Sequence, residues 1–194
     1  MIELILQLDL QLFYFINSNL SNTIFDYIFI FFHDCHKNLW FVIPLLFLWL
    51  FFIFRDKKNR IGLILLIPLV ILITDQIGSK IKDLEIRKRP YMKIDEDNIN
   101  LLVNTPKNKD GLYKNTKSSK KSFPSNHSAN IWALSTILSY IYNSKKKYFM
   151  ILAILVSISR VYVGVHYPLD IIAGAGIGLI VSFLVIKLSK QLIR

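Results

Sequence analysis

Cysteine, a cleavable leader and internal repeats are scarce or missing in this sequence. Its one cysteine, Cys35, excludes an internal disulfide and gives no information about the redox compartment. The N-terminus has neither a basic region nor a small-residue cleavage site, so no removable signal peptide is expected. Acidic residues are few, 13 against 24 lysines and arginines, for a formal net charge of +11. No module of interleaved aromatic and basic residues accompanies this charge, and nucleic acid is therefore not an expected partner.

Apolar residues, in contrast, are abundant and arranged in long blocks. They make up 53% of the 194 residues, and the mean hydropathy is +0.42. Such blocks are typical of a membrane protein, and lysines that flank spans or line anion sites account for the basic charge. The length fits a single membrane-embedded domain over residues 1–194.

The blocks predict an all-α bundle that crosses the membrane about six times. Residues 1–17 carry apolar side chains at helical intervals with polar interruptions, which favours an interfacial amphipathic helix. The expected spans are residues 23–32, 39–54, 61–77, 128–142, 148–163 and 169–186. The last one contains Gly174 and Gly178, a small-residue face suited to close helix contact.

Charged links set the expected orientation. The links 55–60 and 143–147 and the tail after Ile186 are rich in lysine and arginine, so we expect all three in the cytoplasm. Alternation then places the links 33–38, 78–127 and 164–168 outside. Every polar cluster at a helix end would lie on the outer face of a bacterial cytoplasmic membrane. Residues 90–123 form a long polar extracytoplasmic loop, either an active-site cover or a disordered linker.

Residues 159–170, SRVYVGVHYPLD, place an arginine, a histidine and an aspartate between two apolar blocks. Ionisable groups at membrane depth are costly and are therefore functional candidates. Pro168 suits the first position of a helix, which makes Tyr167 the N-cap. Asp170 then lies in the first turn, faces His166 and can orient its imidazole. A polar helix–helix contact, or an arginine reaching the interface, is the alternative for this segment.

The long loop begins after a basic segment, KDLEIRKRP. Lys82 and Arg89 are seven residues apart, so on a helix that ends before Pro90 both project from nearly the same face. Two cations on one face form an anion clamp, with arginine as a bidentate donor. Interfacial anchoring of the basic residues is the alternative interpretation.

The loop ends at SFPSNHS, which leads into an apolar helix. Ser125 is a good N-cap, and the free N–H groups of the helix N-terminus form a phosphate site. His127 in that first turn can donate a proton to a leaving group. Simple capping, with the histidine at the level of the headgroups, is the alternative.

Together the three clusters place cations, histidines, a carboxylate and a helix N-terminus on one membrane face. These residues are Lys82, Arg89, Arg160, His127, His166, Asp170 and Ser125. No group of Asp and Glu residues is arranged to hold a metal, and the sequence implies no cofactor. Metal-free phosphoryl transfer needs this combination of charge neutralisation, an oriented nucleophile and a proton donor.

The motifs K-x6-RP, PSNH and SR-x5-H-x3-D, in this order, resemble the signature of the type-2 phosphatidic acid phosphatase superfamily. The resemblance covers residues 82–170 and implies that His166 is a nucleophile forming a phosphohistidine, oriented by Asp170. It implies that His127 is the general acid. The implied phosphate ligands are Lys82, Arg89, Ser125, Arg160 and backbone N–H groups near Asn126. The family often has glycine where Asn126 stands; asparagine tolerates unusual backbone angles, and its amide is a candidate determinant of headgroup choice.

The resemblance implies a membrane lipid phosphatase that acts on lipid phosphates or diphosphates. Lipid A 1-phosphate and undecaprenyl diphosphate are the first candidates, and phosphatidylglycerophosphate follows. Vanadium haloperoxidases share the motifs, but those relatives are soluble. A non-catalytic lipid-binding or transport protein is the other alternative, although cations alone would suffice for it. The sequence does not set the oligomeric state.

Asp75, near the outer end of 61–77, lies outside these motifs. It is spaced by seven from Lys82 and by fourteen from Arg89. Because an isolated buried charge is costly, we expect a cationic partner from a neighbouring helix, Arg160 first. Asp75 would then hold a phosphate-binding cation in place; a solvated or protonated group near the headgroups is the alternative.

Overall fold

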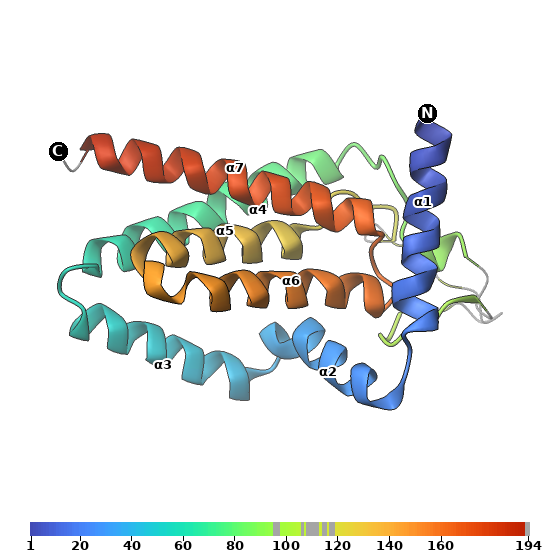
Figure 1. Cartoon of the computed structure of the whole chain (residues 1–194), viewed down its shortest axis with the longest axis horizontal. Helices are drawn as coiled ribbons and strands as arrows, with labels where there is room; N and C mark the ends of the chain where they lie inside the picture. The colour runs from blue at the N-terminus through green and yellow to red at the C-terminus, as the bar shows by residue number, and fades with distance from the viewer. Residues whose placement is uncertain (95–97, 106, 108–112, 114–115, 117–118, 193–194) are drawn as a thin grey trace.

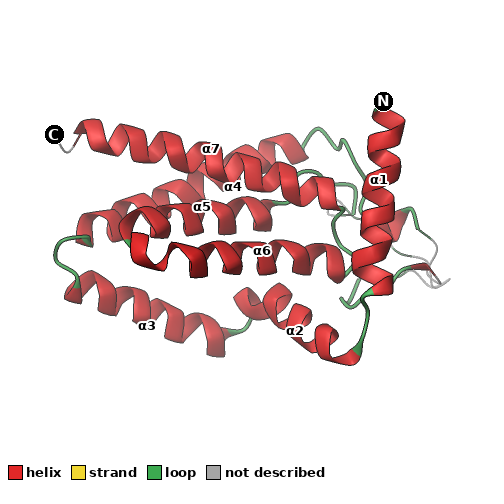
Figure 2. Ribbon diagram, in the orientation of Figure 1, coloured by secondary structure: helices red, strands yellow, loops and turns green. Residues whose placement is uncertain are grey.

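The structure is a computed structural model that describes the chain except residues 95–97, 106, 108–112, 114–115, 117–118 and 193–194. Apart from an isolated bridge between Lys107 and Tyr113, the described residues contain no strand (Figure 2). The all-α prediction is confirmed for this part of the chain. Its α-helices are α1 (Ile2–Tyr14), α2 (Thr23–Asp34), α3 (Leu39–Arg55), α4 (Ile67–Lys82), α5 (Asn126–Ile141), α6 (Lys146–Tyr162) and α7 (Pro168–Leu192).

Helices α4, α6 and α7 run beside α5, and α1 lies across one end of the bundle (Figure 1). Helix α5 contacts α4, α6 and α7, and it is the central element of the bundle. A π-helical turn, Gly62–Leu66, leads directly into α4. The C-terminus lies at the end of the bundle opposite α1 (Figure 1). This arrangement brings the starts of α5 and α7 and the ends of α4 and α6 together near α1.

Small residues allow α5 and α7 to pack closely. A Cβ atom at Gly174 would collide with the carbonyl oxygen of Ser125, and one at Gly178 with that of Ala129. Gly176, between them, faces open space. The predicted small-residue face of α7 is therefore confirmed at two of the three glycines, where the backbones of the two helices approach each other.

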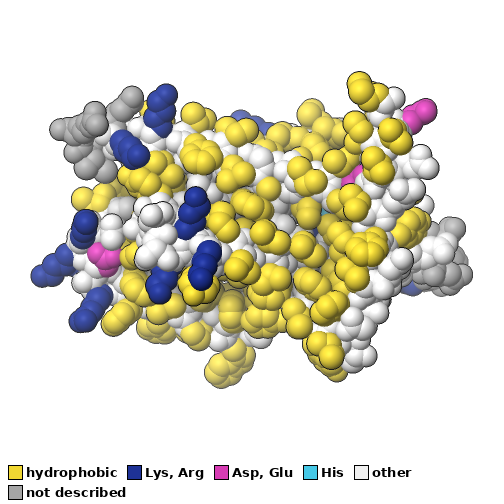
Figure 3. All heavy atoms as spheres, viewed as in Figure 1, with side chains coloured by type: hydrophobic (Ala, Val, Ile, Leu, Met, Phe, Trp, Pro, Cys, Tyr) yellow, Lys and Arg dark blue, Asp and Glu magenta, His cyan; other side chains and the backbone are white. Residues whose placement is uncertain are grey.

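The long sides of the bundle are apolar. Hydrophobic side chains cover the face seen in Figure 3, while lysines and arginines gather at the end away from α1. Large side chains exposed on α3, α4 and α7 include Phe47, Phe51, Phe54, Leu69, Leu72, Ile180 and Phe183. The buried residues of α5 are, in contrast, mostly alanine, serine and threonine. An apolar exterior around a small-residue interior is typical of a helical membrane protein.

The number of membrane crossings is not confirmed as six. Two helical segments, Gly62–Lys82 and Pro168–Lys190, are long and apolar enough to cross a membrane by themselves. The segments Thr23–Lys37 and Leu39–Arg55 pass the same test only as a pair, bent by 66° at the break between them.

The segments 23–32 and 39–54 are not antiparallel, because α2 and α3 meet at a bend of 66°. Asn38 caps α3 directly after the turn, and the chain bends there instead of reversing (Figure 1). The side chain of Asn17 donates hydrogen bonds to the carbonyl oxygens of Asn100 (2.8 Å) and Tyr162 (2.7 Å). The segment before α2 therefore lies at the same end as the long loop, whereas alternation of six spans would place it at the end of 55–60.

Candidate active site

His166 and Asp170 form a buried pair where α6 passes into α7. Helix α7 begins at Pro168, and Asp170 in its first turn accepts a hydrogen bond from the backbone N–H of Tyr167 (2.9 Å). The same carboxylate oxygen, Oδ2, lies 3.4 Å from Nδ1 of His166. Both side chains are almost inaccessible to solvent. The predicted helix start and the predicted approach of Asp170 to His166 are confirmed.

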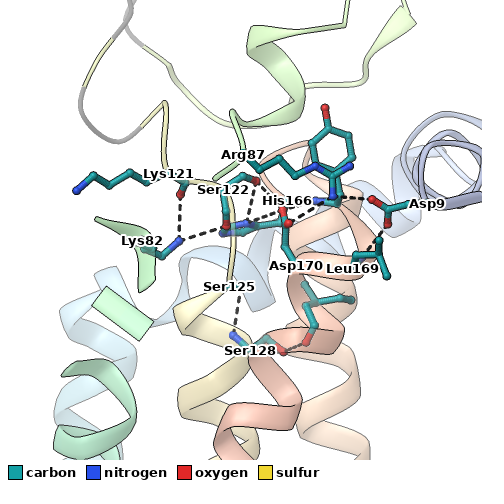
Figure 4. Close-up of polar contacts among 12 residues, drawn as sticks. Asp9, Lys82, Arg87, Lys121, Ser122, Ser125, Ser128, His166, Leu169 and Asp170 are labelled. Carbon is teal, nitrogen blue, oxygen red and sulfur yellow. Dashed lines mark hydrogen bonds and ion pairs between the residues drawn. The ribbon is translucent and has the colours of Figure 1, made fainter. Parts of the chain in front are cut away.

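Ser122 is a third buried residue that contacts this pair, and the sequence did not reveal it. Its hydroxyl donates a hydrogen bond to Oδ2 of Asp170 (2.5 Å) and lies 3.4 Å from Nδ1 of His166 (Figure 4). Ser122 is completely buried. Its place two residues before the PSNH motif was the available signal, but serine is common in loops and nothing in its spacing pointed to Asp170.

Lys82 and Arg89 do not share a helix face. Helix α4 ends at Lys82, and the chain turns through Glu85, whose φ is 47°. Two backbone hydrogen bonds, of 2.8 and 3.0 Å, then pair the segment 87–89 with 119–122. The prediction of a clamp on one helix is wrong, because this pairing satisfies the backbone groups and Pro90 disfavours helix at Arg89.

Lys82 nevertheless points toward the loop that carries Ser122. Its ammonium group donates hydrogen bonds to the carbonyl oxygens of Lys121 (3.0 Å) and Ser122 (3.3 Å) (Figure 4). Lys82 and Arg89 therefore reach the neighbourhood of His166 from different segments, one helical and one extended.

The environment of His166 keeps its imidazole neutral. The pKa of His166 is lowered to about 3, chiefly by burial and also by the nearby positive charges of Arg89 and Lys82, against the opposing effect of Asp170. With its proton on Nδ1 toward Asp170, the imidazole carries a free lone pair on Nε2. That is the protonation state of a nucleophile.

The N-terminus of α5 lies beside the pair. Ser125 is its N-cap, as predicted, and its hydroxyl accepts a hydrogen bond from the N–H of Ser128 (3.4 Å). The backbone N–H of Ser125 donates to the carbonyl oxygen of Asp170 (2.9 Å). The starts of α5 and α7 are thus joined directly, and both helix dipoles point their positive ends at the same region.

His127 occupies the first turn of α5 and is exposed, unlike His166. Its Nε2 lies 3.4 Å from Nε2 of His36, which belongs to the turn between α2 and α3. His36 is a second residue that the sequence analysis missed, because the residues 33–38 were assigned to an ordinary loop between two spans.

Arg160 lies at the end of α6 and is buried. Its carbonyl oxygen accepts hydrogen bonds from the N–H groups of Val165 (3.2 Å) and His166 (3.1 Å). Its Nε has no hydrogen-bond partner within the described part of the chain. A buried guanidinium with a spare donor suits an anionic ligand.

Asn126 and Asp75 are partners of each other. The amide of Asn126 donates to Oδ1 of Asp75 (3.1 Å) and to the hydroxyl of Ser79 (3.2 Å), and Asn130 also donates to Oδ1 (3.3 Å). Within the described residues Asp75 therefore binds amides from α5. The expected partnership with a cation, Arg160 first, is wrong, because the first turn of α5 lies nearer to α4 than α6 does.

Asp9 and Arg87 complete the surroundings of Asp170. Nη1 of Arg87 lies 2.6 Å from Oδ2 of Asp9 and 3.5 Å from Oδ1 of Asp170 (Figure 4). Asp9 is one of the polar residues that interrupt the apolar pattern of residues 1–17, where an interfacial helix was expected. The face of α1 that packs on the protein carries Asp9 and Phe13, whereas Ile5, Leu8 and other apolar residues of α1 are exposed.

The arrangement as a whole suits phosphoryl transfer. A neutral, oriented imidazole lies among cations and two helix N-termini, and a second, exposed imidazole is available for proton transfer. Among the residues that the structure describes, no group of three or more His, Cys, Asp or Glu side chains is placed to hold a metal ion. The prediction that no metal takes part remains a prediction.

The chain is similar to several known proteins. The chain is 30% identical over 154 residues to the lipid A 4'-phosphatase of Porphyromonas gingivalis, a match covering 78% of this chain and 61% of that protein. It is 25% identical over 138 residues to the bacitracin transport permease protein BcrC of Bacillus licheniformis, covering 71% of this chain and 61% of that protein. The matches thus span about three fifths of the length of these curated relatives.

The fold is similar to that of a solved structure. The crystal structure of Aquifex aeolicus LpxE superposes with a TM-score of 0.71 at 26% identity, covering 93% of this chain and 95% of that chain. Residues 63–194, which include all three motifs, match the model of the PAP2 superfamily. The chain therefore belongs to the PAP2 superfamily.

Proposed function

We propose that this protein is a metal-independent membrane lipid phosphatase that works through a phosphohistidine. The observation that carries the proposal is the buried pair of His166 and Asp170, 3.4 Å apart, with a neutral imidazole. Nε2 of His166 attacks phosphorus, and the bond between phosphorus and the lipid oxygen breaks. His127 gives that oxygen its proton; water then attacks the phosphohistidine, returns a proton to His127 and releases phosphate.

The remaining site residues bind and neutralise the phosphoryl group in this proposal. Lys82, Arg89 and Arg160 supply positive charge, and Ser125 and Asn126 supply donors at the N-terminus of α5. The buried Nε of Arg160 and the helix N-terminus support these roles. Asp170 keeps the proton of His166 on Nδ1 and stabilises the positive charge that develops on the ring.

The proposed substrate is a lipid phosphate, with the phosphomonoester of a lipid A-type molecule first and undecaprenyl diphosphate second. The relative named lipid A 4'-phosphatase favours the first of these. A site at the end of an apolar bundle also suits a headgroup that enters from the bilayer. Phosphatidylglycerophosphate is the third candidate.

The proposed location is a bacterial cytoplasmic membrane, with the site on the outer face. Lysines and arginines gather at the opposite end of the bundle (Figure 3), which supports a cytoplasmic position for that end. We further propose one broken span for α2 with α3, followed by α4, α5, α6 and α7, so that the chain crosses five times as one domain. Helix α1 would lie in the outer interface with its apolar face toward lipid.

Phosphate release by the purified protein tests the function. The panel contains a lipid A phosphate, undecaprenyl diphosphate, phosphatidylglycerophosphate and phosphatidic acid, each with and without EDTA. We expect release from at least one lipid in EDTA, inhibition by vanadate, and complete loss in His166→Ala. Strict dependence on added magnesium, or normal release by His166→Ala, would contradict the mechanism.

A transport protein is the second candidate, because one relative is named a transport permease. Binding alone requires the cations but not a general acid. His127→Ala distinguishes the two classes: an enzyme loses much more activity on alkyl phosphates than on an aryl phosphate, whose leaving group needs little protonation. An equal loss of activity on alkyl and aryl phosphates would show that His127 is not the general acid.

A further inference from the structure

Asp9 is a buried carboxylate that the proposed reaction does not use. It lies on α1, is 2% exposed, and belongs to the part of the chain before residues 63–194 that match the family. Its Oδ1 accepts a hydrogen bond from the backbone N–H of Leu169 (2.7 Å), in the first turn of α7. Its Oδ2 lies 2.6 Å from Arg87. A buried charge with two such partners is held in one position.

Arg87 lies between two carboxylates. Its Nη1 is 2.6 Å from Asp9 but 3.5 Å from Asp170. Its guanidinium also stacks on the ring of Tyr167, with Cζ 3.4 Å from the ring centroid. Figure 4 shows the three charged side chains in a row, with His166 beside Asp170 at the far end from Asp9. The stacking and the shorter ion pair together hold the guanidinium on the Asp9 side.

The closer contact of Arg87 with Asp9 than with Asp170 affects how Asp170 interacts with His166. An arginine that bound Asp170 alone would neutralise the carboxylate that must stabilise a positive imidazole. Because Asp9 takes the closer contact, Oδ2 of Asp170 remains bound to Ser122 and the N–H of Tyr167, facing His166. Asp9 also fixes the backbone of Leu169, the residue before Asp170.

We propose that Asp9 and Arg87 are positioning residues for Asp170, and that α1 is through them a required part of the active site. The proposal rests on the proposed function. It assigns to the N-terminal helix a role in catalysis in addition to contact with lipid. Asp9 holds Arg87, Arg87 leaves Asp170 free to orient His166, and neither touches the substrate.

Kinetics of four variants and two control variants, measured on the preferred lipid in mixed micelles, test the proposal. Asp9→Asn keeps the acceptor for Leu169 but removes the charge, and we expect kcat to fall by about 10-fold to 100-fold with KM nearly unchanged. Arg87→Met leaves two buried carboxylates without their cation, and its kcat should fall further than that of Asp9→Asn. The double variant should be more active than Arg87→Met alone, because it removes one of the unpaired charges. Glu3→Gln and Lys88→Met, exposed neighbours on the same segments, are the matched controls and should match the wild type.

A fourth variant separates positioning from folding. Phe13→Leu weakens the packing of α1, since Phe13 is fully buried beside Tyr167, but it leaves all charges in place. Melting temperatures of the purified variants show how much each change destabilises the protein. A kcat loss in Asp9→Asn well beyond that of an equally destabilised Phe13→Leu supports the proposal.

Three results would overturn the proposal that Asp9 and Arg87 position Asp170. They are a wild-type kcat in Asp9→Asn, additive losses of kcat in the double variant, or an equal loss of kcat in Phe13→Leu at equal stability. A wild-type protein without phosphatase activity on any lipid would overturn the proposed function, and this inference with it. An active wild type with an unaffected Asp9→Asn overturns the inference alone.

Discussion

The amide of Asn126 donates a hydrogen bond to the carboxylate of Asp75 over 3.1 Å, from the first turn of α5 to α4. Gly78 makes room for this contact, because a Cβ atom there would lie 2.6 Å from Oδ1 of Asn126. An asparagine thus fits at a position where the family often has glycine, since α4 presents a glycine opposite it and an acceptor beside it. The hydrogen-bond partners of Asp75 among the described residues are therefore amides at the start of α5, those of Asn126 and Asn130.

Asp75→Asn should therefore lower the phosphatase activity while the amount of expressed protein changes little. Replacing a charged acceptor by a neutral one weakens the hold on Asn126 by about 1 kcal/mol, which corresponds to about fivefold in kcat/KM. Steady-state kinetics on the preferred lipid measure the loss. In an Asn126→Gly background the same change should have little further effect. Wild-type kinetics of Asp75→Asn at every substrate concentration would contradict any role for Asp75.

The packing of α7 on α5 gives a prediction with an internal control. Gly178→Ala forces a Cβ atom against the carbonyl oxygen of Ala129, and the two helices must separate to relieve the contact. Gly176→Ala adds the same atom in open space. We expect a clearly lower melting temperature and lower activity for Gly178→Ala, and no change for Gly176→Ala. Equal melting temperatures would show that the helices are less closely packed.

Part of the site could be predicted from the sequence because it is local. The contact between Asp170 and His166 spans four residues, and Pro168 fixes the helix start between them. Ser125 as N-cap follows from the same kind of short-range chemistry. Residue type and spacing are sufficient for such contacts, and these predictions were confirmed.

The other contacts of the site join residues that are far apart in the sequence, and the spacing of residue types does not encode such contacts. Asp9 lies 160 positions from its partner Leu169, and its burial reverses the usual amphipathic pattern, since the apolar side of α1 faces outward. Arg89 reaches the site through pairing with 119–122, so its helical spacing from Lys82 was misleading. In a membrane protein, an apolar face indicates lipid as readily as a core.

The low pKa of His166 makes stability depend on pH. In the unfolded chain this histidine binds a proton as the pH falls below its ordinary pKa of 6.5, whereas in the folded protein burial keeps it neutral down to about pH 3. The unfolded state therefore binds more protons in this interval, and stability falls with falling pH by at most about 1.4 kcal/mol per pH unit. The unfolded His166→Gln variant does not bind a proton at this position, so it lacks this contribution to the pH dependence.

Melting temperatures between pH 7 and pH 5 test this prediction. The wild type should lose more stability on acidification than His166→Gln. The contributions of the other histidines cancel in this comparison because both proteins contain them. Parallel pH curves of the two proteins would mean that His166 is not kept neutral by burial.

The last prediction concerns the number of crossings. Single cysteines replace Asn19, Lys58, Lys88 or Lys146 in a Cys35→Ser background, and a membrane-impermeant thiol reagent is added to intact cells. Five crossings place Asn19 on the same side as Lys88, since Asn17 hydrogen-bonds to Asn100 beside the long loop. Six crossings would instead place it with Lys58 and Lys146.

We expect cysteines at 19 and 88 to react from outside, and those at 58 and 146 only after the cells are opened. A bend of 66° within one span is compatible with this pattern, because the chain continues in the same overall direction from α2 into α3 (Figure 1). Protection of the cysteine at 19 in intact cells, with labelling at 88, would restore six spans. It would also separate α1 from the outer face and so remove Asp9 from the site. The labelling of one residue therefore decides both the topology and whether the N-terminal helix can contribute to the active site.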